Sequence, residues 1–169
     1  MNQRATIDDV AKLAGVSIAT VSRVISKSDR VRASTRAQVL QAIEHLHYQP
    51  DASARALASG RTYTVGCVIP TLDHSIFARA TQAMQTVLSD AGFQLLVGSS
   101  NYESNTELQV VRAFQQRGVD ALVLVGTDHA ASLWDAVTQW GKPVLLSWSC
   151  DPRLPSVGFD NETIARHMT

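Results

Sequence analysis

The chain has 169 residues, a length that corresponds to one domain or two small ones. Its 15 Lys and Arg balance 15 Asp and Glu, and its 45% hydrophobic and 18% charged residues exclude disordered, collagen-like and disulfide-rich classes. Cys67 and Cys150 are its only cysteines, so it lacks a zinc motif and a disulfide framework, and a reducing compartment is expected. The first residues are charged and no run of 18 apolar residues occurs, so we expect neither export nor a membrane span.

The balanced charge hides an asymmetry between two parts of the chain. Residues 1–62 contain nine Lys or Arg against five acids, whereas the remaining residues contain six against ten. A net of +4 followed by a net of −4 suggests two modules with different partners, and a polyanion suits the first.

The basic part predicts three short helices. Thr6 and Asp9 form a capping-box pattern before a helix over residues 7–14, Gly15 permits a sharp turn, and Ser17 caps a second helix over residues 18–26. Two short helices joined by a glycine-containing turn predict a helix-turn-helix. A third helix is expected from Ser34, with its apolar face at Val39, Ala42, Ile43 and Leu46.

The second helix is expected to turn its apolar side, Val21, Val24 and Ile25, inward. The opposite face then carries Ile18, Ala19 and Arg23 among small serines, which suits entry into a major groove. The arginine could bridge guanine O6 and N7, and the small apolar side chains could meet a thymine methyl. The alternative is that Arg23 is an ordinary solvated charge and Ile18 an ordinary exposed apolar residue.

The runs TIDDVAKLAGVSIATVSRVIS (6–26) and VRASTRAQVLQAIEHLHYQPDASARALASG (31–60) resemble the N-terminal domain of the lac repressor family of bacterial regulators. The resemblance implies a homodimer, when full length, that reads a near-palindromic double-stranded DNA operator, with Ile18, Ala19 and Arg23 as base-reading residues. It also implies phosphate contacts, a role that suits hydroxyls and helix N-termini. The candidates are Thr6, Ser17, Thr20, Ser22, Ser26, Arg32, Ser34 and Thr35.

A short helix is expected between Asp51, as its cap, and Gly60. So short a helix is marginal alone in water and should order on a partner. The resemblance implies that it enters the minor groove, with Leu57 as a wedge and Ala54 and Arg55 beside it, although Asp51 departs from the Asn common in the family. The alternative is an unstructured linker with one incidental leucine. The predicted organisation is a DNA-binding domain over residues 1–49, a hinge over 50–62 and an effector lobe over 63–169.

The acidic part alternates short apolar runs with helical patterns, which predicts a doubly wound α/β lobe with a parallel sheet. No G-x-G-x-x-G and no Walker A run follow its strands, so no nucleotide cofactor is expected, and no cofactor of any kind is predicted. The predicted strands are 65–69, 94–97, 121–125, 144–147 and 157–159, and the predicted helices 77–91, 103–117 and 132–140.

Ligands of such sheets lie beyond the carboxyl ends of the strands. Aromatic, hydroxyl, amide and carboxylate side chains follow those ends, which suits a small polar ligand such as a sugar. The segment resembles the first lobe of the family's sensor domain, which is similar to periplasmic sugar-binding proteins. The ending VGFDNETIARHMT is similar to gluconate-responsive members, which implies a sugar-acid effector. The implied effector residues are His74, Phe77, Asn101, Trp148 and Asp160, with Arg79 as a second candidate for the carboxylate.

Core positions for Phe77 and Trp148, and solvated surface positions for His74 and Arg79, remain the alternatives. Family members are roughly twice as long as this chain, which implies a truncated chain with an incomplete lobe. A helix expected from Asn161 stops at Thr169.

The sequence therefore predicts a small all-α helix-turn-helix domain plus an incomplete, periplasmic-binding-protein-like α/β lobe. The expected protein is a cytoplasmic, nucleoid-associated transcriptional regulator, most simply a repressor, and not an enzyme. Two other classes were weighed. A sugar-capturing binding protein is disfavoured by the basic first part and the absent export signal, and a hydrolase using Cys150 or Ser149 by the absence of a G-x-S-x-G motif.

Overall fold

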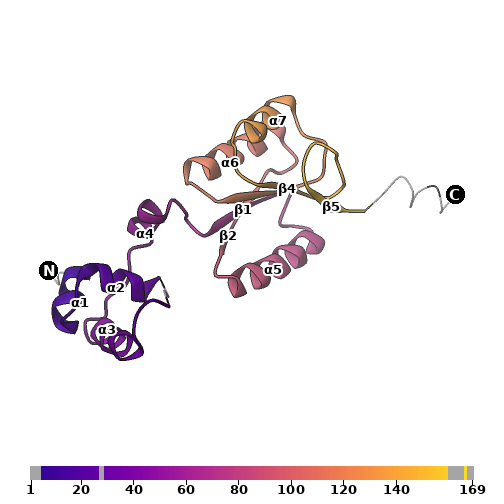
Figure 1. Cartoon of the computed structure of the whole chain (residues 1–169). Helices are drawn as coiled ribbons and strands as arrows, with labels where there is room; N and C mark the ends of the chain where they lie inside the picture. Colours follow the sequence, from indigo (N-terminus) through magenta and orange to yellow (C-terminus); the bar gives the residue numbers. More distant parts are fainter. Residues whose placement is uncertain (1–4, 27–28, 160–165, 167–169) are drawn as a thin grey trace. The chain divides into compact units, whose positions relative to one another are not determined.

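The computed structural model describes residues 5–26, 29–159 and 166. They divide into two compact units, residues 1–55 and residues 56–169 (Figure 1). In chain order the elements are α1 (Ile7–Ala14), α2 (Ile18–Ile25), α3 (Ala33–His45), α4 (Ala52–Ser59), β1 (Thr64–Ile69), α5 (Ser75–Asp90), β2 (Gln94–Ser99), α6 (Ser104–Gln116), β3 (Ala121–Val125), α7 (Ala131–Thr138), β4 (Val144–Trp148) and β5 (Ser156–Gly158).

The first unit is built from α1, α2 and α3. Thr6 and Asp9 form the expected capping box: the Thr6 hydroxyl accepts the Asp9 N–H, and Asp9 Oδ2 accepts the Thr6 N–H at 2.9 Å. Gly15 ends α1 at φ 64°, a left-handed conformation that glycine adopts without a steric penalty. Ser17 then caps α2 by accepting the Thr20 N–H at 3.2 Å. These local interactions place both helix boundaries where the sequence predicts them.

The three helices share a small apolar core. Val10, Val21 and Val39 are fully buried, one from each helix. Ile25, expected inside with Val21, is partly buried at the edge of this cluster. A core of this size holds α2 against α1 and α3 and leaves its other face open.

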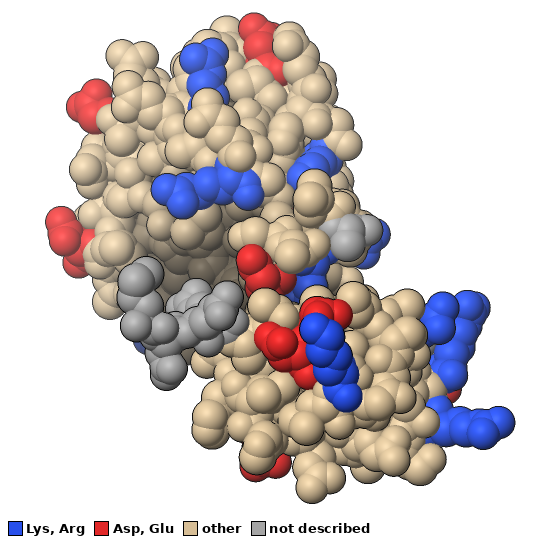
Figure 2. Space-filling view, turned by 90° about the vertical axis from the view of Figure 1, so that its left-hand side faces the viewer, with Lys and Arg blue, Asp and Glu red and all other residues tan. Residues whose placement is uncertain are grey.

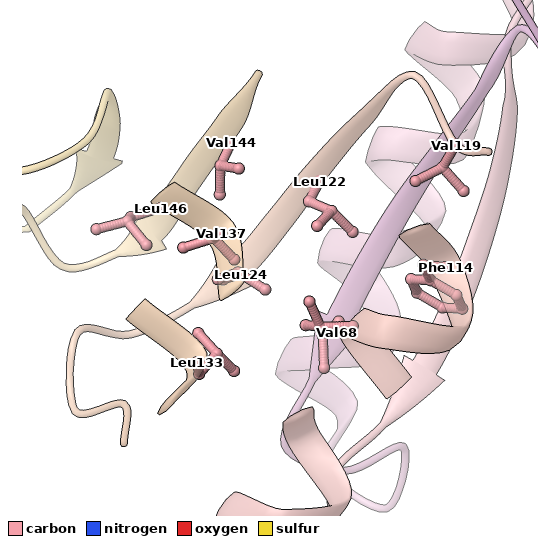
Figure 3. Close-up of a cluster of buried hydrophobic side chains, with 10 residues drawn as sticks. Val68, Phe114, Val119, Leu122, Leu124, Leu133, Val137, Val144 and Leu146 are labelled. Atoms are coloured by element: carbon pink, nitrogen blue, oxygen red, sulfur yellow. The ribbon is translucent and has the colours of Figure 1, made fainter. Parts of the chain in front are cut away.

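The second unit is a five-stranded parallel sheet in the described residues, with strand order β2-β1-β3-β4-β5. One face carries α6 and α7 and the other carries α5 (Figure 1). The α6 and α7 side contains Phe114, Leu122, Leu124, Leu133 and Leu146, which interdigitate between helices and strands (Figure 3). The α5 side buries shorter strand residues under half-buried helix residues. The predicted fold class is therefore confirmed.

Several boundaries differ from the predictions by one or two residues. Helix α5 begins at Ser75, two residues before the predicted start at Phe77. The apolar pattern does not include Ser75 and Ile76, because both are exposed. Helix α3 begins at Ala33, and its N-cap Arg32 makes no side-chain cap hydrogen bond. Strand β5 spans Ser156–Gly158, since its pairing with β4 ends at Trp148 opposite Gly158. The helix expected from Asn161 lies outside the described residues.

Candidate functional site

The outer face of α2 is exposed along its length. Val21 and Val24 are 0% and 3% exposed, whereas Ile18, in the first turn of the helix, is 48% exposed. Ala19 and Arg23 lie on that exposed face too. The residues around Arg23 are small, so the guanidinium projects from a low surface that a groove could accept. The structure thus places the three predicted base-reading side chains together on one solvent-facing helix side.

The predicted phosphate-contact residues lie near the helix N-termini and on the same exposed helix. Thr20 and Thr35 are half-buried, and the other six are exposed. Four hydroxyls already hold local structure. The Thr6 hydroxyl accepts the Asp9 N–H, Ser17 Oγ caps α2 and lies 2.9 Å from Thr20 Oγ1, and Ser26 Oγ donates to the Arg23 carbonyl at 3.2 Å. In the space-filling view, Lys and Arg side chains project from one edge of the helical unit, the lower body of Figure 2. This unit therefore combines exposed hydroxyls and cations, the groups that contact phosphates.

Helix α4 is a short helix with an exposed leucine. Asp51 Oδ1 accepts the N–H groups of Ser53 at 2.8 Å and Ala54 at 3.4 Å, which confirms its role as the cap. Gly60 follows the helix in the left-handed conformation at φ 69°. Leu57 is 90% exposed, the highest value among the exposed large hydrophobic residues of the described part of the chain. The predicted minor-groove residues therefore lie on a helix that buries no side chain among its described residues.

Two aromatic side chains predicted to line the effector site are in contact. The Phe77 and Trp148 rings have centroids 5.5 Å apart at an interplanar angle of 49°, and His74 lies 6.5 Å from Phe77. Both rings are half-buried, and Phe77 also packs against the core under α5. Trp148 has φ 72°, an uncommon conformation for a bulky residue, at the carboxyl end of β4. The structure thus brings together His74, Phe77 and Trp148.

No ring contact joins the other predicted effector residues that the structure describes, Asn101 and Arg79, to this group. Asn101 is exposed at φ 52° beyond β2, and its Oδ1 accepts a hydrogen bond from Ser99 Oγ at 3.1 Å. Arg79 is exposed on α5. Asp160 lies outside the described residues. The effector role of all these residues therefore stays a prediction.

Sequence reasoning missed a polar cluster in the second unit. His129 and Glu107 are 2% and 13% exposed at their side chains and lie 3.1 Å apart. The His129 ring meets the Trp134 ring edge-on at 5.4 Å, and the Arg153 guanidinium stacks 3.6 Å from the centre of the same ring. Because these residues come from α6, the loop before α7, α7 and the β4–β5 loop, their approach leaves no signature in local spacing.

The β4–β5 loop closes this cluster with a bidentate ion pair. Arg153 Nε and Nη2 donate to the two Asp151 carboxylate oxygens at 2.8 and 2.7 Å, and the Arg153 N–H donates at 2.9 Å. The side-chain bonds first, and then the backbone bond, lower the pKa of Asp151 to about 2. The loop that follows Trp148 is therefore held by charge-assisted hydrogen bonds and by stacking on α7.

Among the described residues, no group of three or more His, Cys, Asp or Glu side chains is arranged to hold a metal ion. Within the same part of the chain, none of the helices has the length and apolar character needed to cross a bilayer.

Comparison with known proteins assigns both units. Residues 6–51 match the model of bacterial regulatory proteins of the lacI family, and residues 62–169 match that of periplasmic binding proteins and the sugar binding domain of the LacI family. Catabolite control protein A of Streptococcus mutans is 34% identical over 163 residues, which are 95% of this chain and 49% of the relative. The chain spans about half the length of the curated relatives it matches.

Solved structures give the same picture. A crystal structure of a LacI family transcriptional regulator from Silicibacter pomeroyi has a TM-score of 0.79 and 31% identity over 97% of this chain and 50% of that chain. The lac repressor dimer bound to operator and the anti-inducer ONPF has a TM-score of 0.79 over 98% of this chain and 52% of that chain, and at 24% identity it supports the fold alone. The named relatives are transcriptional regulators, in agreement with the prediction that the chain is not an enzyme. Both family models and these relatives show that the chain belongs to the lacI family of bacterial regulatory proteins.

Proposed function

We propose that the chain is a sequence-specific DNA-binding transcriptional regulator, most simply a repressor, that responds to a sugar or sugar acid. The observation that carries the proposal is the exposed outer face of α2, where Ile18, Ala19 and Arg23 are exposed while Val21 and Val24 are buried. An α-helix fits the major groove of B-DNA, and an arginine on it can make two hydrogen bonds to one guanine.

Phosphate contacts would fix the register of this helix on the duplex. The eight predicted contact residues, from Thr6 to Thr35, and the net positive charge of residues 1–62 support such contacts. Each phosphate neutralised by a cation releases condensed counterions, so affinity should fall steeply with salt. A homodimer would read two half-sites of a near-palindromic operator.

Helix α4 would add a minor-groove contact. An exposed leucine flanked by Ala54 and Arg55 suits insertion between base pairs, since apolar wedges open a base step and bend the duplex toward the major groove. A helix of eight residues is marginal in water, so its order should depend on DNA and on a second copy.

The effector would bind at the carboxyl edge of the sheet. The contact between Phe77 and Trp148 offers two ring faces for the apolar side of a sugar, and His74 beside them offers a partner for a carboxylate. A gluconate-like acid is the specific ligand we favour, on the similarity of the segment from Val157 to Thr169 to gluconate-responsive family members. Asn101 and Asp160 would complete the polar contacts.

Selection of bound sites from random duplexes by the 169-residue chain tests the proposal. We expect enrichment of a short half-site motif and loss of binding as salt rises. The chain with both Ile18→Ala and Arg23→Ala is the matched control and should retain duplexes without enriching a motif. The selection is repeated with sugars and sugar acids at increasing concentration.

The competing class is a sugar-binding protein whose helical unit contacts proteins. That class predicts sugar binding by calorimetry with no duplex retained at low salt. Equal enrichment by the unaltered chain and the double variant would contradict the base-reading role of α2 while leaving nonspecific DNA binding possible.

A further inference from the structure

The short segment between α4 and β1 is fastened to the sheet by residues that precede β3. Asp120 Oδ2 accepts the Tyr63 N–H at 2.7 Å, and Asp120 Oδ1 accepts the Thr62 N–H at 3.2 Å. The Thr62 hydroxyl donates to the Gly118 carbonyl at 3.0 Å, and the Asp120 N–H donates to the Thr64 carbonyl at 2.7 Å. Four hydrogen bonds thus join two segments that lie 56 to 58 residues apart in sequence.

The backbone of Tyr63 is held in a conformation that is unfavourable for a bulky side chain. Its φ is 52°, in the left-handed region that bulky residues rarely adopt. Besides the bond to Asp120, its carbonyl accepts the Gln94 N–H at 2.8 Å and its ring packs on Phe93 at 5.5 Å. Such a backbone conformation persists only where the surroundings over-determine it, so the contacts to Asp120, Phe93 and Gln94 define the direction of the chain here.

The same fastening continues to the end of α4. Ser59 Oγ accepts the Arg61 N–H at 3.3 Å and donates to the Arg61 carbonyl at 3.2 Å, directly before Thr62. The end of α4, the segment 60–63 and the start of β1 are therefore connected by consecutive hydrogen bonds. A carboxylate that accepts two backbone N–H groups makes charge-assisted bonds, which are stronger than neutral ones.

We infer that Asp120 is a positioning residue: its carboxylate fixes Thr62 and Tyr63 in the segment that joins α4 to β1, and the DNA affinity of the chain depends on it. The inference rests on the proposed function and adds a residue outside the DNA-facing and effector-facing sets. Among the described residues of the 118–121 segment, the Asp120 carboxylate is the group that accepts the Thr62 and Tyr63 N–H groups. Removing this carboxylate would therefore leave both amides without these acceptors.

Asp120→Asn tests this with almost no change of volume. An asparagine keeps one acceptor oxygen and turns a donor NH2 toward the second N–H, so one of the two bonds is lost. Asp135→Asn is the matched control, because Asp135 is exposed on α7 and this substitution removes the same charge from the same unit. Thr62→Val removes only the bond to Gly118 and should give a smaller effect in the same direction.

Two readouts are measured with the full chain well below its unfolding temperature. Amide hydrogen exchange at Thr62 and Tyr63 without DNA reports the fastening itself. Affinity is measured for a duplex selected from random sequence by the unaltered chain and for an unselected random duplex. We expect Asp120→Asn to speed exchange at the amide that loses its acceptor and to weaken the selected duplex roughly fivefold or more, with the random duplex unchanged.

A merely structural role would lower the unfolding temperature and leave the ratio of the two affinities as it was, and that result overturns the inference. Unchanged exchange at Thr62 and Tyr63 also overturns it, whatever the duplex does. If the unaltered chain retains no duplex, the proposed function fails and the DNA role of Asp120 fails with it, while the exchange data still decide whether the carboxylate holds the segment. An equal loss with Asp135→Asn would assign the effect to net charge and overturn the inference.

Discussion

The imidazole of His129 and the carboxylate of Glu107 lie within hydrogen-bond distance in the interior of the second unit. His129 Nδ1 lies 3.1 Å from Glu107 Oε2, and Nε2 lies 3.2 Å from the Gly126 carbonyl oxygen. A neutral imidazole has a single N–H, so it can donate to only one of two oxygen acceptors. Both contacts are hydrogen bonds only when the ring carries two protons or Glu107 carries one. Asp151 faces this group, and the charge of His129 is among the smaller causes that lower the pKa of Asp151.

Two replacements of Glu107 distinguish its hydrogen bond to His129 from its packing. Glu107→Leu leaves Nδ1 buried without a partner and should lower the free energy of unfolding by about 1–3 kcal/mol. Glu107→Gln should cost less, because its NH2 can donate to a neutral Nδ1 while Nε2 donates to Gly126. Urea unfolding followed by tryptophan fluorescence measures this for the second unit alone, since Trp134, Trp140 and Trp148 all lie there. Equal losses for the two variants would show that packing, and not a hydrogen bond to Nδ1, accounts for the loss.

Removing the Arg23 guanidinium should weaken binding at one base position. We expect Arg23→Ala to cost about 1–3 kcal/mol against the preferred base and little against the other three. Competition binding with duplexes altered at each position measures this. Arg112→Ala, an exposed arginine on α6, is the matched control. A uniform loss across all sequences would show that Arg23 contacts phosphate instead of a base.

Shortening Leu57 should reduce DNA bending more than it reduces overall affinity. An alanine cannot fill an opened base step, so the opening cost of a few kcal/mol is no longer offset. Gel mobility with circularly permuted duplexes measures the bend angle. Leu40→Ala is the control: Leu40 is a half-exposed leucine on α3, and its replacement should leave bending unchanged. An unchanged bend with Leu57→Ala would contradict the wedge.

The two cysteines should differ sharply in reactivity. Burial raises the pKa of the Cys67 thiol to about 12, while Cys150 is exposed. A disulfide-forming thiol reagent should therefore label Cys150 alone in the folded chain and both residues in denaturant. Cys150→Ser should abolish labelling of the folded chain, and residual fast labelling would show that Cys67 is accessible.

The same thiol makes stability depend on pH in a defined direction. The folded chain holds the Cys67 proton above the ordinary thiol pKa of 9, whereas the unfolded chain releases it there. The unfolded state therefore binds fewer protons between pH 9 and about 12, and stability should fall as pH rises through that window. Urea midpoints of Cys67→Ala, compared with the unaltered chain at pH 7 and pH 10, isolate this contribution.

Gly66 allows β1 and α6 to approach closely. A Cβ at this position would lie 2.5 Å from Phe114 Cδ2 and 2.8 Å from Leu122 Cδ2. Gly66→Ala should therefore destabilise the second unit by about 1–3 kcal/mol through overpacking. Phe114→Leu in the Gly66→Ala background should recover part of that loss, and a double-mutant cycle measures the coupling. Purely additive losses would show that the two side chains do not compete for the same space.

The elements that sequence reasoning placed best are those fixed by neighbours in the chain. The ends of α1 and α2 depend on Thr6, Asp9, Gly15 and Ser17, whose interactions span three residues. The start of α5 was misplaced by two residues because no comparable side-chain cap marks His74. The strand positions followed from continuous apolar runs, which a sheet buried on both faces requires.

The residues expected to contact DNA were also predictable from local pattern. Once Val21 and Val24 face the core, helical geometry alone puts Ala19 and Arg23 on the other side and leaves Ile18, three residues before Val21, at the edge of the buried face. The polar cluster around His129 and the fastening at Asp120 were not predictable. Their partners are 22 and 57 to 58 residues away, and no periodicity links them.

The amino-acid order by itself determined two modules of opposite charge, a helix-turn-helix and a parallel α/β lobe, because capping, turn chemistry and apolar periodicity act over a few residues. Tertiary structure alone decided which distant polar groups meet: Asp120 with the segment before β1, Glu107 with His129, and Arg153 with Trp134. The physical reason is that a buried hydrogen-bonding group needs a partner at about 3 Å, and only the folding of the strands side by side brings such partners together.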